Sequence, residues 1–387
     1  MNHESTRRRI ALLLPGGVSK FDEGLHIPSL YRLVERLSTR FDITVYSLLA
    51  PSIASFSQSC GDARIKYLGY DYRAHWTRKL TGFLRLAATD HLRQRYDLFH
   101  GMSGLPSALA SIILGALFKV PSVVSFVGGE TANLPQFGFG NLRSPAIRAL
   151  TRLVALKATK LVLLCRQQQE QLFTWGLHKD DLLIIPRGVD TEMFRPKEKT
   201  LQPPYRFIHV ANLYPVKDQR TLLRAFQVIL TKVDATLRII GNDYLDGAMQ
   251  TYARELGIGE RVQFLGQLRN ELLPEHYHWA HVMLHTSAHE GGGIVFAEAA
   301  ACGVVIVGTR VGLLAELAPA GAVAVNVGDY QALAQETIDL LNNPTRYNRL
   351  REQALRWAHT YNLDWTVDQY SHLYEKLIKN RNDSRYR

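Results

Sequence analysis

The stretch His289-Glu-Gly-Gly-Gly-Ile-Val-Phe-Ala-Glu298 places two glutamates, Glu290 and Glu298, on either side of three consecutive glycines. Consecutive glycines disfavour a helix, so we expect Glu290 to lie in a loop and a helix to begin near Gly293 or Ile294. Backbone N–H groups at such a helix start are unpaired and suit a phosphate. With carboxylates to accept hydrogen bonds from hydroxyls, the segment suits a diphosphate flanked by two polyols. From these residues alone, a glycine-rich turn with two solvated glutamates is the alternative.

A second informative segment, Phe207-Ile-His-Val-Ala-Asn-Leu-Tyr-Pro-Val-Lys217, predicts a strand that ends at Val210 and is followed by a loop. The loop carries Asn212 and Lys217, and a helix is expected to begin near Asp218. The dipole of that helix repels a cation at its N-terminus. An anionic ligand between the ammonium group and the helix would explain Lys217 in this position. A solvated surface lysine is the other interpretation.

Apolar strand-like runs alternate with helical patterns along the whole chain, which predicts βα units and parallel sheets. We expect strands at residues 10–14, 43–48, 98–101, 122–126, 161–164, 206–210, 236–240, 262–265, 282–284, 304–307 and 322–325. Helical patterns fall at residues 27–37, 107–117, 219–230, 245–256, 295–301, 331–341 and 344–360. Prolines punctuate residues 186–204, so we predict two doubly wound domains, residues 1–190 and 191–361, with a cleft between them.

Composition excludes several classes of protein. Of the 387 residues, 46% are hydrophobic and 21% are charged, as in globular chains of two domains. The three cysteines form no CxxC pair, which indicates a reducing compartment and argues against a structural zinc site. The apolar runs at 10–14 and 108–118 are too short for a secretory or membrane-spanning segment, so we expect a cytoplasmic protein, soluble or peripheral. Pro15-Gly16-Gly17 lacks the spacing of G-x-G-x-x-G, which disfavours a nicotinamide-binding fold.

The positive charge is concentrated in the first half of the chain. Residues 1–190 hold 24 Lys/Arg and 14 Asp/Glu, a net charge of +10, whereas residues 191–387 hold 22 and 21, a net charge of +1. This excess indicates an anionic partner for the first half, although a basic surface that only aids solubility gives the same count. Residues 75–85 mix basic and apolar side chains, which suits either a membrane interface or a packed surface helix.

The glutamate and lysine segments together resemble the second domain of GT-B glycosyltransferases, and of glycosyltransferase family four in particular. Glu290 and Glu298 stand at the two positions of that family's Glu-x7-Glu motif. Residues 299–303 and 308–316 are similar to the stretch that follows the motif.

Three further segments extend the resemblance. Residues 185–194, Ile-Pro-Arg-Gly-Val-Asp-Thr-Glu-Met-Phe, resemble the interdomain segment of the family, and residues 213–226 resemble the loop that carries a phosphate-binding lysine. Residues 365–377 look like the closing helix that returns to the first domain. We therefore assign a C-terminal helix at about 362–387 to that domain.

The resemblance implies a GT-B fold, with the donor nucleotide in the second domain, the acceptor in the first and the reaction in the cleft. It also implies a retaining, metal-independent transfer from a nucleotide-diphosphate sugar, with no cofactor besides that co-substrate. Lys217 and Glu290 are then the predicted catalytic residues: Lys217 opposes the charge of the diphosphate and Glu290 holds the transferred sugar. Glu298 is predicted to hold the ribose. The other predicted donor-binding residues are Asn212, Gly291, Gly292, Gly293 and Ile294.

The first domain matches the family less closely. Gly24 resembles an N-terminal glycine loop, and the Gly16-Gly17 pair is a rival for that role. Val127 occupies the position where many members carry a histidine near the sugar. The candidate acceptor-side residues are Gly24, Val127, Gly128 and Glu130.

The residues expected to compensate the charge of the diphosphate also differ from those of the family. Asn212 stands where members often have an arginine that contacts phosphate. The diphosphate charge is therefore left to Lys217, the helix dipole and one of two arginines, Arg187 or Arg310. No Asp-x-Asp occurs in the chain, so we predict no metal site.

Two rival functions stay open at this point. One rival is a GT-B epimerase or phosphorylase; the epimerase would need an acid or base from the first domain at the sugar, for which Glu130 is the nearby candidate. A non-enzymatic binder of nucleic acid or of an anionic surface would explain the basic half, but no RNA-binding motif or recognition helix is found, so nucleic acid is not expected. We expect an anionic membrane surface or lipid-linked acceptor as partner, with the protein peripheral at the inner membrane face in cell-envelope polysaccharide or glycolipid synthesis.

Overall fold

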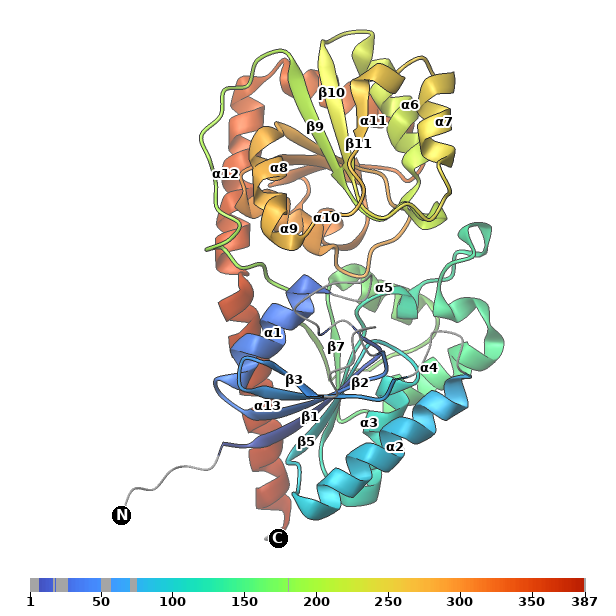
Figure 1. The fold of residues 1–387 in the computed structure, drawn as a ribbon, viewed down its shortest axis with the longest axis vertical. Coiled ribbons are helices and arrows are strands. Elements are labelled where there is room, and N and C mark those ends of the chain that lie inside the picture. Colours follow the sequence, from blue (N-terminus) through green and yellow to red (C-terminus); the bar gives the residue numbers. More distant parts are fainter. Residues whose placement is uncertain are drawn as a thin grey trace.

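The structure is a computed structural model that describes residues 7–16, 18, 27–49, 57–69, 75–179 and 181–385. Figure 1 shows two domains stacked along the long axis of the molecule, each with helices around a central sheet. The α/β fold class predicted from the alternating apolar runs is confirmed. Among the described residues, no helix is both long enough and apolar enough to cross a lipid bilayer.

The described part of the first domain contains an eight-stranded sheet in the order β3-β4-β2-β1-β5-β6-β7-β8. Its strands are β1 (Arg9–Leu14), β2 (Asp42–Ser47), β3 (Ser57–Cys60), β4 (Ala63–Tyr67), β5 (Leu98–Met102), β6 (Ser122–Ser125), β7 (Lys160–Leu163) and β8 (Leu182–Ile184). Neighbouring strands are parallel except β3 and β4, which pair antiparallel at one edge.

Helices cover both faces of this sheet, because alternate side chains of each strand point to opposite faces. The helices are α1 (Pro28–Ser38), α2 (Trp76–Arg93), α3 (Ser107–Phe118), α4 (Pro145–Lys157), α5 (Arg166–Thr174) and α13 (Leu363–Arg385). Ile10 and Leu12 of β1 pack in one buried cluster with α1 and α13. Ala11 and Leu13 pack in another with α2 and α3, and α3 lies between α2 and α4.

The C-terminal helix α13 follows α12 (Pro344–Thr360) and runs from the second domain down the side of the first (Figure 1). Its apolar side chains belong to the core of the first domain. A buried polar contact also fastens it, because Tyr374 Oη lies 2.6 Å from His100 Nδ1 on β5.

The second domain contains a parallel sheet in the order β11-β10-β9-β12-β13-β14. Its strands are β9 (Tyr205–Val210), β10 (Ala235–Ile240), β11 (Val262–Phe264), β12 (Val282–His285), β13 (Val305–Thr309) and β14 (Ala322–Val325). Its helices are α6 (Gln219–Leu230), α7 (Ala248–Glu255), α8 (Leu273–Trp279), α9 (Ile294–Ala301), α10 (Gly312–Leu317), α11 (Tyr330–Leu341) and α12.

Each sheet has a point where its strand order reverses. β9 pairs with β10 on one side and with β12 on the other, and β1 pairs in the same way with β2 and β5. Ligands of open α/β sheets bind in the crevice outside the carboxyl ends of the strands at such points. The loops after β9 and β12 carry the two segments singled out in the sequence, so the topology brings them together.

Several elements differ from the sequence-based expectations. The strands β3, β4 and β8 and the short helices α5, α8 and α10 were not predicted, because short strands and short helices give little apolar periodicity. The helix expected at 245–256 begins later, at Ala248. Asp243 accepts hydrogen bonds from the backbone amides of Leu245 (2.8 Å) and Gly247 (3.0 Å), which holds the preceding residues in a turn.

Candidate functional site

A cavity of about 1170 Å³ lies between the two domains. The predicted donor-binding residues of the second domain all line it: Asn212, Lys217, Glu290, Gly291, Gly292, Gly293, Ile294 and Glu298. From the first domain it takes Val127 and Gly128, whereas Glu130 is buried at 3% exposure and is not part of its wall. Gly24 and Gly17 lie outside the described residues.

The glycine loop ends where the sequence predicts. Helix α9 begins at Ile294, and Gly293 precedes it with a φ of +81°, a conformation that favours glycine. No side chain in the described part of the chain caps this helix start. A Cβ on Gly291 would lie 2.7 Å from the carbonyl oxygen of Val127, so the loop packs directly on the first domain. The backbone amides at the start of α9 are therefore available at the cavity between the domains.

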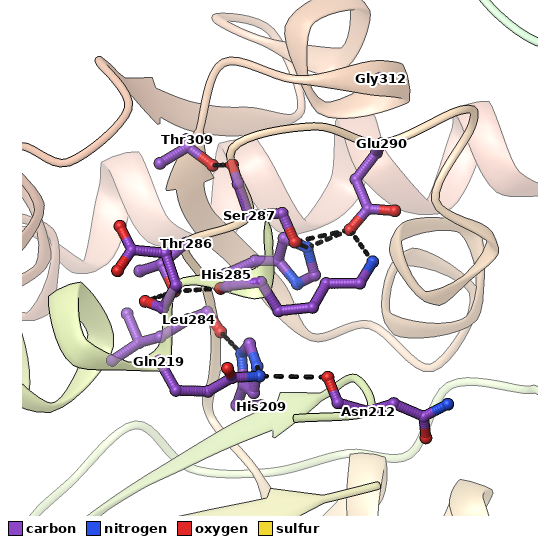
Figure 2. Close-up of polar contacts among 12 residues, drawn as sticks. His209, Asn212, Gln219, Leu284, His285, Thr286, Ser287, Glu290, Thr309 and Gly312 are labelled. Carbon is purple, nitrogen blue, oxygen red and sulfur yellow. Dashed lines mark hydrogen bonds and ion pairs between the residues drawn. The ribbon is translucent and has the colours of Figure 1, made fainter. Parts of the chain in front are cut away.

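Glu290 lies at the centre of a polar network (Figure 2). Its Oε1 is 2.5 Å from Lys217 Nζ and 2.8 Å from His285 Nε2, and it accepts a hydrogen bond from Ser287 Oγ at 2.7 Å. Burial acts to raise the pKa of Glu290, but Lys217 and His285 outweigh it and hold the pKa well below its usual value. Glu290 is therefore a carboxylate at neutral pH and can only accept hydrogen bonds.

The ion pair between Lys217 and Glu290 shows that our explanation for the position of Lys217 was wrong. Because a cation beside a helix start is unfavourable, we expected an external anion to compensate it. Asp218 instead caps α6 with a carboxylate, which accepts from the Thr221 amide at 3.3 Å, and Glu290 provides the ion-pair partner for Lys217. The compensating anion is therefore part of the protein.

Two buried histidines support this network from behind. The rings of His209 and His285 lie 5.3 Å apart, and His209 Nδ1 is 2.9 Å from the carbonyl oxygen of Leu284 (Figure 2). Burial lowers the pKa of His209 to about 3 and also lowers the pKa of His285, so both rings are neutral at pH 7. His285 Nδ1 has no hydrogen-bond partner among the described residues, an unfavourable state for a buried ring nitrogen.

The loop that carries the network is fastened to neighbouring strands. Thr309 Oγ1 donates to the carbonyl oxygen of Ser287 at 2.6 Å. Thr286 Oγ1 donates to the carbonyl oxygens of Lys217 and Asp218 at 3.1 and 2.9 Å. These bonds fix the two loops, after β9 and after β12, relative to each other.

Glu298 has a different environment from Glu290. It lies on α9 at 6% exposure, and its Oε2 accepts a hydrogen bond from Tyr277 Oη at 2.9 Å. Burial raises the pKa of Glu298 to about 7, although the Tyr277 hydrogen bond acts in the opposite direction. The two motif glutamates thus have opposite pKa shifts within one cavity.

The acceptor-side loop of the first domain is held by Glu130. Glu130 Oε1 accepts from the Gly104 amide at 2.8 Å, and Oε2 accepts from the Gly128 amide at 2.6 Å. Both carboxylate oxygens thus bind backbone amides. This arrangement positions Val127 and Gly128 at the cavity wall.

An imidazole from the second domain reaches this same loop. His289 lines the cavity, and its Nε2 lies 3.3 Å from the carbonyl oxygen of Gly128. Its Nδ1 lies 3.5 Å from Gln171 Nε2 on α5. The first domain has Val127 where the family often has histidine, and the structure places a histidine of the other domain beside that position.

Of the two arginines considered for charge compensation, the structure brings Arg187 to the cavity. Arg187 is a lining residue, whereas Arg310 is not and donates to the carbonyl oxygen of Ala324 at 3.1 Å. The described residues contain no group of three or more His, Cys, Asp or Glu side chains that could hold a metal ion.

Sequence reasoning missed four residues of the site: Tyr277, His285, Ser287 and His289. His285 had a usable signal, because a polar residue at the end of an apolar strand often lies at the ligand-binding edge of a parallel sheet. Tyr277 had none, since it contacts Glu298 only through the tertiary fold.

Two family models match the chain. Residues 27–188 match the glycosyl transferase 4-like domain, and residues 190–357 match glycosyl transferases group 1. The D-inositol 3-phosphate glycosyltransferase of Thermomonospora curvata is 29% identical over 326 residues, which cover 76% of this chain and 74% of the relative. A GDP-mannose-dependent alpha-(1-6)-phosphatidylinositol monomannoside mannosyltransferase of Mycolicibacterium smegmatis is 31% identical over 193 residues, 45% of this chain and 50% of the relative.

Solved structures share the fold over nearly the whole chain. Sucrose-phosphate synthase from Thermosynechococcus elongatus superposes with a TM-score of 0.84 at 19% identity, covering 97% of this chain and 100% of that one. Anabaena Alr3699/HepE, solved in complex with UDP and glucose, superposes with a TM-score of 0.76 at 16% identity, covering 95% and 99%.

Proposed function

Because this chain is a glycosyltransferase with the GT-B fold that resembles glycosyltransferase family four, we propose that it transfers a sugar, with retention, from a nucleotide-diphosphate sugar to an acceptor hydroxyl. One observation carries the proposal. A single interdomain cavity contains an uncapped glycine-rich helix start, a lysine and two glutamates in contrasting environments.

In the proposed reaction, the backbone amides at Gly292–Ile294 bind the diphosphate, and Lys217 opposes the negative charge that grows as it departs. The acceptor oxygen forms the new bond to the anomeric carbon while the bond from that carbon to the phosphate oxygen breaks. The acceptor proton passes to the departing oxygen. The contribution of the protein is then positioning and electrostatic stabilisation.

The two glutamates suit two hydroxyl-bearing parts of the donor. Glu290 stays ionised, so it is assigned to the transferred sugar, whose hydroxyls donate to it. Glu298 is assigned to the ribose, since it lies more than one turn into the helix whose start would hold the diphosphate. Ribose hydroxyls that donate to Glu298 would favour its ionised form and lower its raised pKa.

A binding experiment tests these assignments. We would titrate the wild-type protein with UDP, GDP and ADP by calorimetry and repeat the titration with Glu298→Ala. Loss of hydrogen bonds to a charged group should cost about 1.5–3 kcal/mol of binding free energy. Glu255→Ala, a change of an exposed glutamate on α7, is the matched control and should bind as the wild type does. Equal affinity of Glu298→Ala and wild type would remove Glu298 from the donor site.

The rival epimerase reaction is tested with the same protein. Incubation with a nucleotide sugar and no acceptor should give at most slow hydrolysis by a transferase. Both oxygens of Glu130, the acid or base candidate for epimerisation, bind backbone amides. Formation of a different sugar nucleotide would contradict the transferase proposal.

We also propose that the acceptor is associated with an anionic membrane surface. The exposed face of α2, α3 and α4, here called the α2–α4 surface, supports this. Residues 75–158, which include these helices, contain ten Lys/Arg and three Asp/Glu. The three acidic side chains all have partners within the fold: Asp90 contacts Lys66, Asp97 accepts from the Arg9 amide, and Glu130 is buried.

Apolar side chains are exposed among these cations. They are Trp76 and Leu92 on α2, Ile113 and Leu117 on α3, and Ile147, Leu153 and Leu156 on α4, and Leu117 is 65% exposed. Apolar and basic side chains on one surface are the combination that binds an interface of anionic lipid. A membrane-bound acceptor would then be met by the domain that contributes the acceptor side of the cavity.

A further inference from the structure

Arg187 lines the cavity, and the donor assignments give it no role. It lies just after β8, in the segment that leads to the second domain, and its neighbours are held by α13. Thr366 Oγ1 donates to the carbonyl oxygen of Pro186 and accepts from the Gly188 amide, both at 2.9 Å. A Cβ on Gly188 would lie 2.0 Å from the carbonyl oxygen of Asn362, so the backbone is packed closely against the start of α13. Arg187 therefore projects from a fixed backbone.

Among the residues that the structure describes, the charge of the Arg187 guanidinium has little compensation. Its Nη1 donates a hydrogen bond to a neutral group, Ser29 Oγ on α1, at 3.3 Å. No carboxylate among the described residues lies within ion-pair distance of it. Glu130 favours the charged form from a distance, but both of its oxygens bind backbone amides. Burial lowers the pKa of Arg187, which is the expected effect of desolvating a cation.

The other cations of the cavity differ from Arg187. Lys217 is paired with Glu290, and Arg269 is exposed to solvent. A half-buried guanidinium with no carboxylate partner among the described residues is unfavourable for folding, yet it offers five N–H donors in a planar fork that matches phosphate and carboxylate. The cost is offset when a ligand supplies the missing anion.

The surroundings of Arg187 favour an anion at this wall. Its hydroxyl partner Ser29 lies in the first turn of α1, and no described side chain caps that helix start, so the helix dipole adds positive potential. The neighbouring parts of the first-domain wall are Pro28, Val127 and Gly128, which carry no charge.

We propose that Arg187 binds an anionic group of the acceptor, a phosphate or a carboxylate, at the first-domain wall of the cavity. This inference rests on the proposed function and adds a substrate class to it: the acceptor carries a negative charge near the hydroxyl that receives the sugar. The same chemistry could come from the donor diphosphate, so the test separates the two sources.

The first measurement is thermal stability without ligand, in wild type and Arg187→Met. Methionine keeps much of the side-chain volume and removes the uncompensated charge, so the melting temperature should stay the same or rise. If Arg187 had only a structural role, its replacement should lower the melting temperature. A melting temperature lowered by several degrees, with unchanged anion binding, would overturn the proposal.

The second measurement is a titration with inorganic phosphate while a nucleoside diphosphate saturates the donor site. Wild type should bind phosphate under these conditions, and Arg187→Met should bind it at least about tenfold more weakly, the effect of losing a charged hydrogen bond. Arg187→Lys should recover part of the affinity, which a folding defect would not do. Arg254→Ala is the control, because Arg254 also donates to one hydroxyl, Thr251 Oγ1 at 3.1 Å, on exposed α7.

The outcomes distinguish the two sources. Displacement of phosphate by the nucleotide, or weaker nucleotide binding by Arg187→Met, would place Arg187 at the donor diphosphate and overturn the acceptor assignment. Absence of phosphate binding by wild type would overturn it as well. If wild type binds no nucleoside diphosphate, the proposed function fails, and phosphate titration of the unliganded protein still tests Arg187.

Discussion

The two walls of the interdomain cavity are built in different ways. The second-domain wall is a charged network in which Lys217, His285 and Ser287 all contact one oxygen of Glu290. The first-domain wall consists of backbone, apolar side chains and the guanidinium of Arg187. One wall therefore compensates its own charges, and the other leaves a positive charge without a carboxylate among its described neighbours.

The difference indicates a division of labour. A self-compensated network can hold a fixed arrangement in the absence of ligand, which suits a donor part that is the same in every turnover. In a wall with an uncompensated cation, the charge is compensated only when an anionic ligand binds. Such a wall can discriminate among acceptors. The predictions below test this contrast, beginning with the largest expected effect.

The strongest test of the second-domain wall is Lys217→Ala. Loss of a cation that opposes growing negative charge should lower the transfer rate at saturating donor by about 10²- to 10³-fold. Because Glu290 would be left as a buried, partly compensated carboxylate, the free energy of unfolding should also fall, by about 3–5 kcal/mol. Rate measurements and urea unfolding check the two effects.

The double variant Lys217→Met/Glu290→Gln separates stability from catalysis. Removal of both charges should restore most of the stability, since no unpaired ion remains, while the transfer rate stays low. An unchanged rate in Lys217→Ala would remove the lysine from the mechanism. Recovered activity in the double variant would show that the single variant acted only through folding.

The raised pKa of Glu298 predicts a pH-dependent stability. Its pKa is raised from 4.5 to about 7, so between these values the folded protein holds a proton that the unfolded chain has released. The stabilisation is fully present below pH 4.5 and is lost as the pH rises through 7, a loss of about 3 kcal/mol. Residue 298 cannot titrate in Glu298→Gln. The unfolding free energy of this variant minus that of wild type should therefore increase by this amount between pH 4.5 and 8. Parallel pH profiles of the two proteins would contradict the assigned pKa.

The α2–α4 surface predicts salt-sensitive binding to anionic vesicles. Each basic residue near an anionic surface contributes about 1 kcal/mol, so Arg152→Glu/Lys157→Glu should reduce co-sedimentation at least about tenfold at low salt. The second-domain variant Lys232→Glu/Arg254→Glu is the matched control and should sediment as wild type does. At 1 M salt the Debye length is only about 3 Å, and the attraction should largely disappear. Equal, negligible binding of wild type to neutral and anionic vesicles would indicate a soluble acceptor.

The smallest expected effect is that of a chelator. The chain has no Asp-x-Asp, and the described residues offer no cluster suited to a metal ion. Transfer should therefore continue at an unchanged rate in excess EDTA. Abolition of activity that magnesium restores would contradict the metal-independent mechanism on which the role of Lys217 rests.

The sequence alone was sufficient for the features that depend on residues close together in the chain. Apolar periodicity predicted most of the strands. The glycine run predicted a helix start near Gly293 or Ile294, and α9 begins at Ile294, because the conformational preferences of glycine act locally. The motif resemblance identified the GT-B fold and selected Lys217, Glu290 and Glu298, all of which line one cavity.

The tertiary structure decided how these groups affect one another. Lys217 and Glu290 are 73 positions apart, and Tyr277 approaches Glu298 from another helix. No described carboxylate forms an ion pair with Arg187, and both oxygens of Glu130 bind backbone amides. A pKa, an ion pair or an uncompensated charge depends on distances and burial in space, and residue spacing along the chain does not determine either.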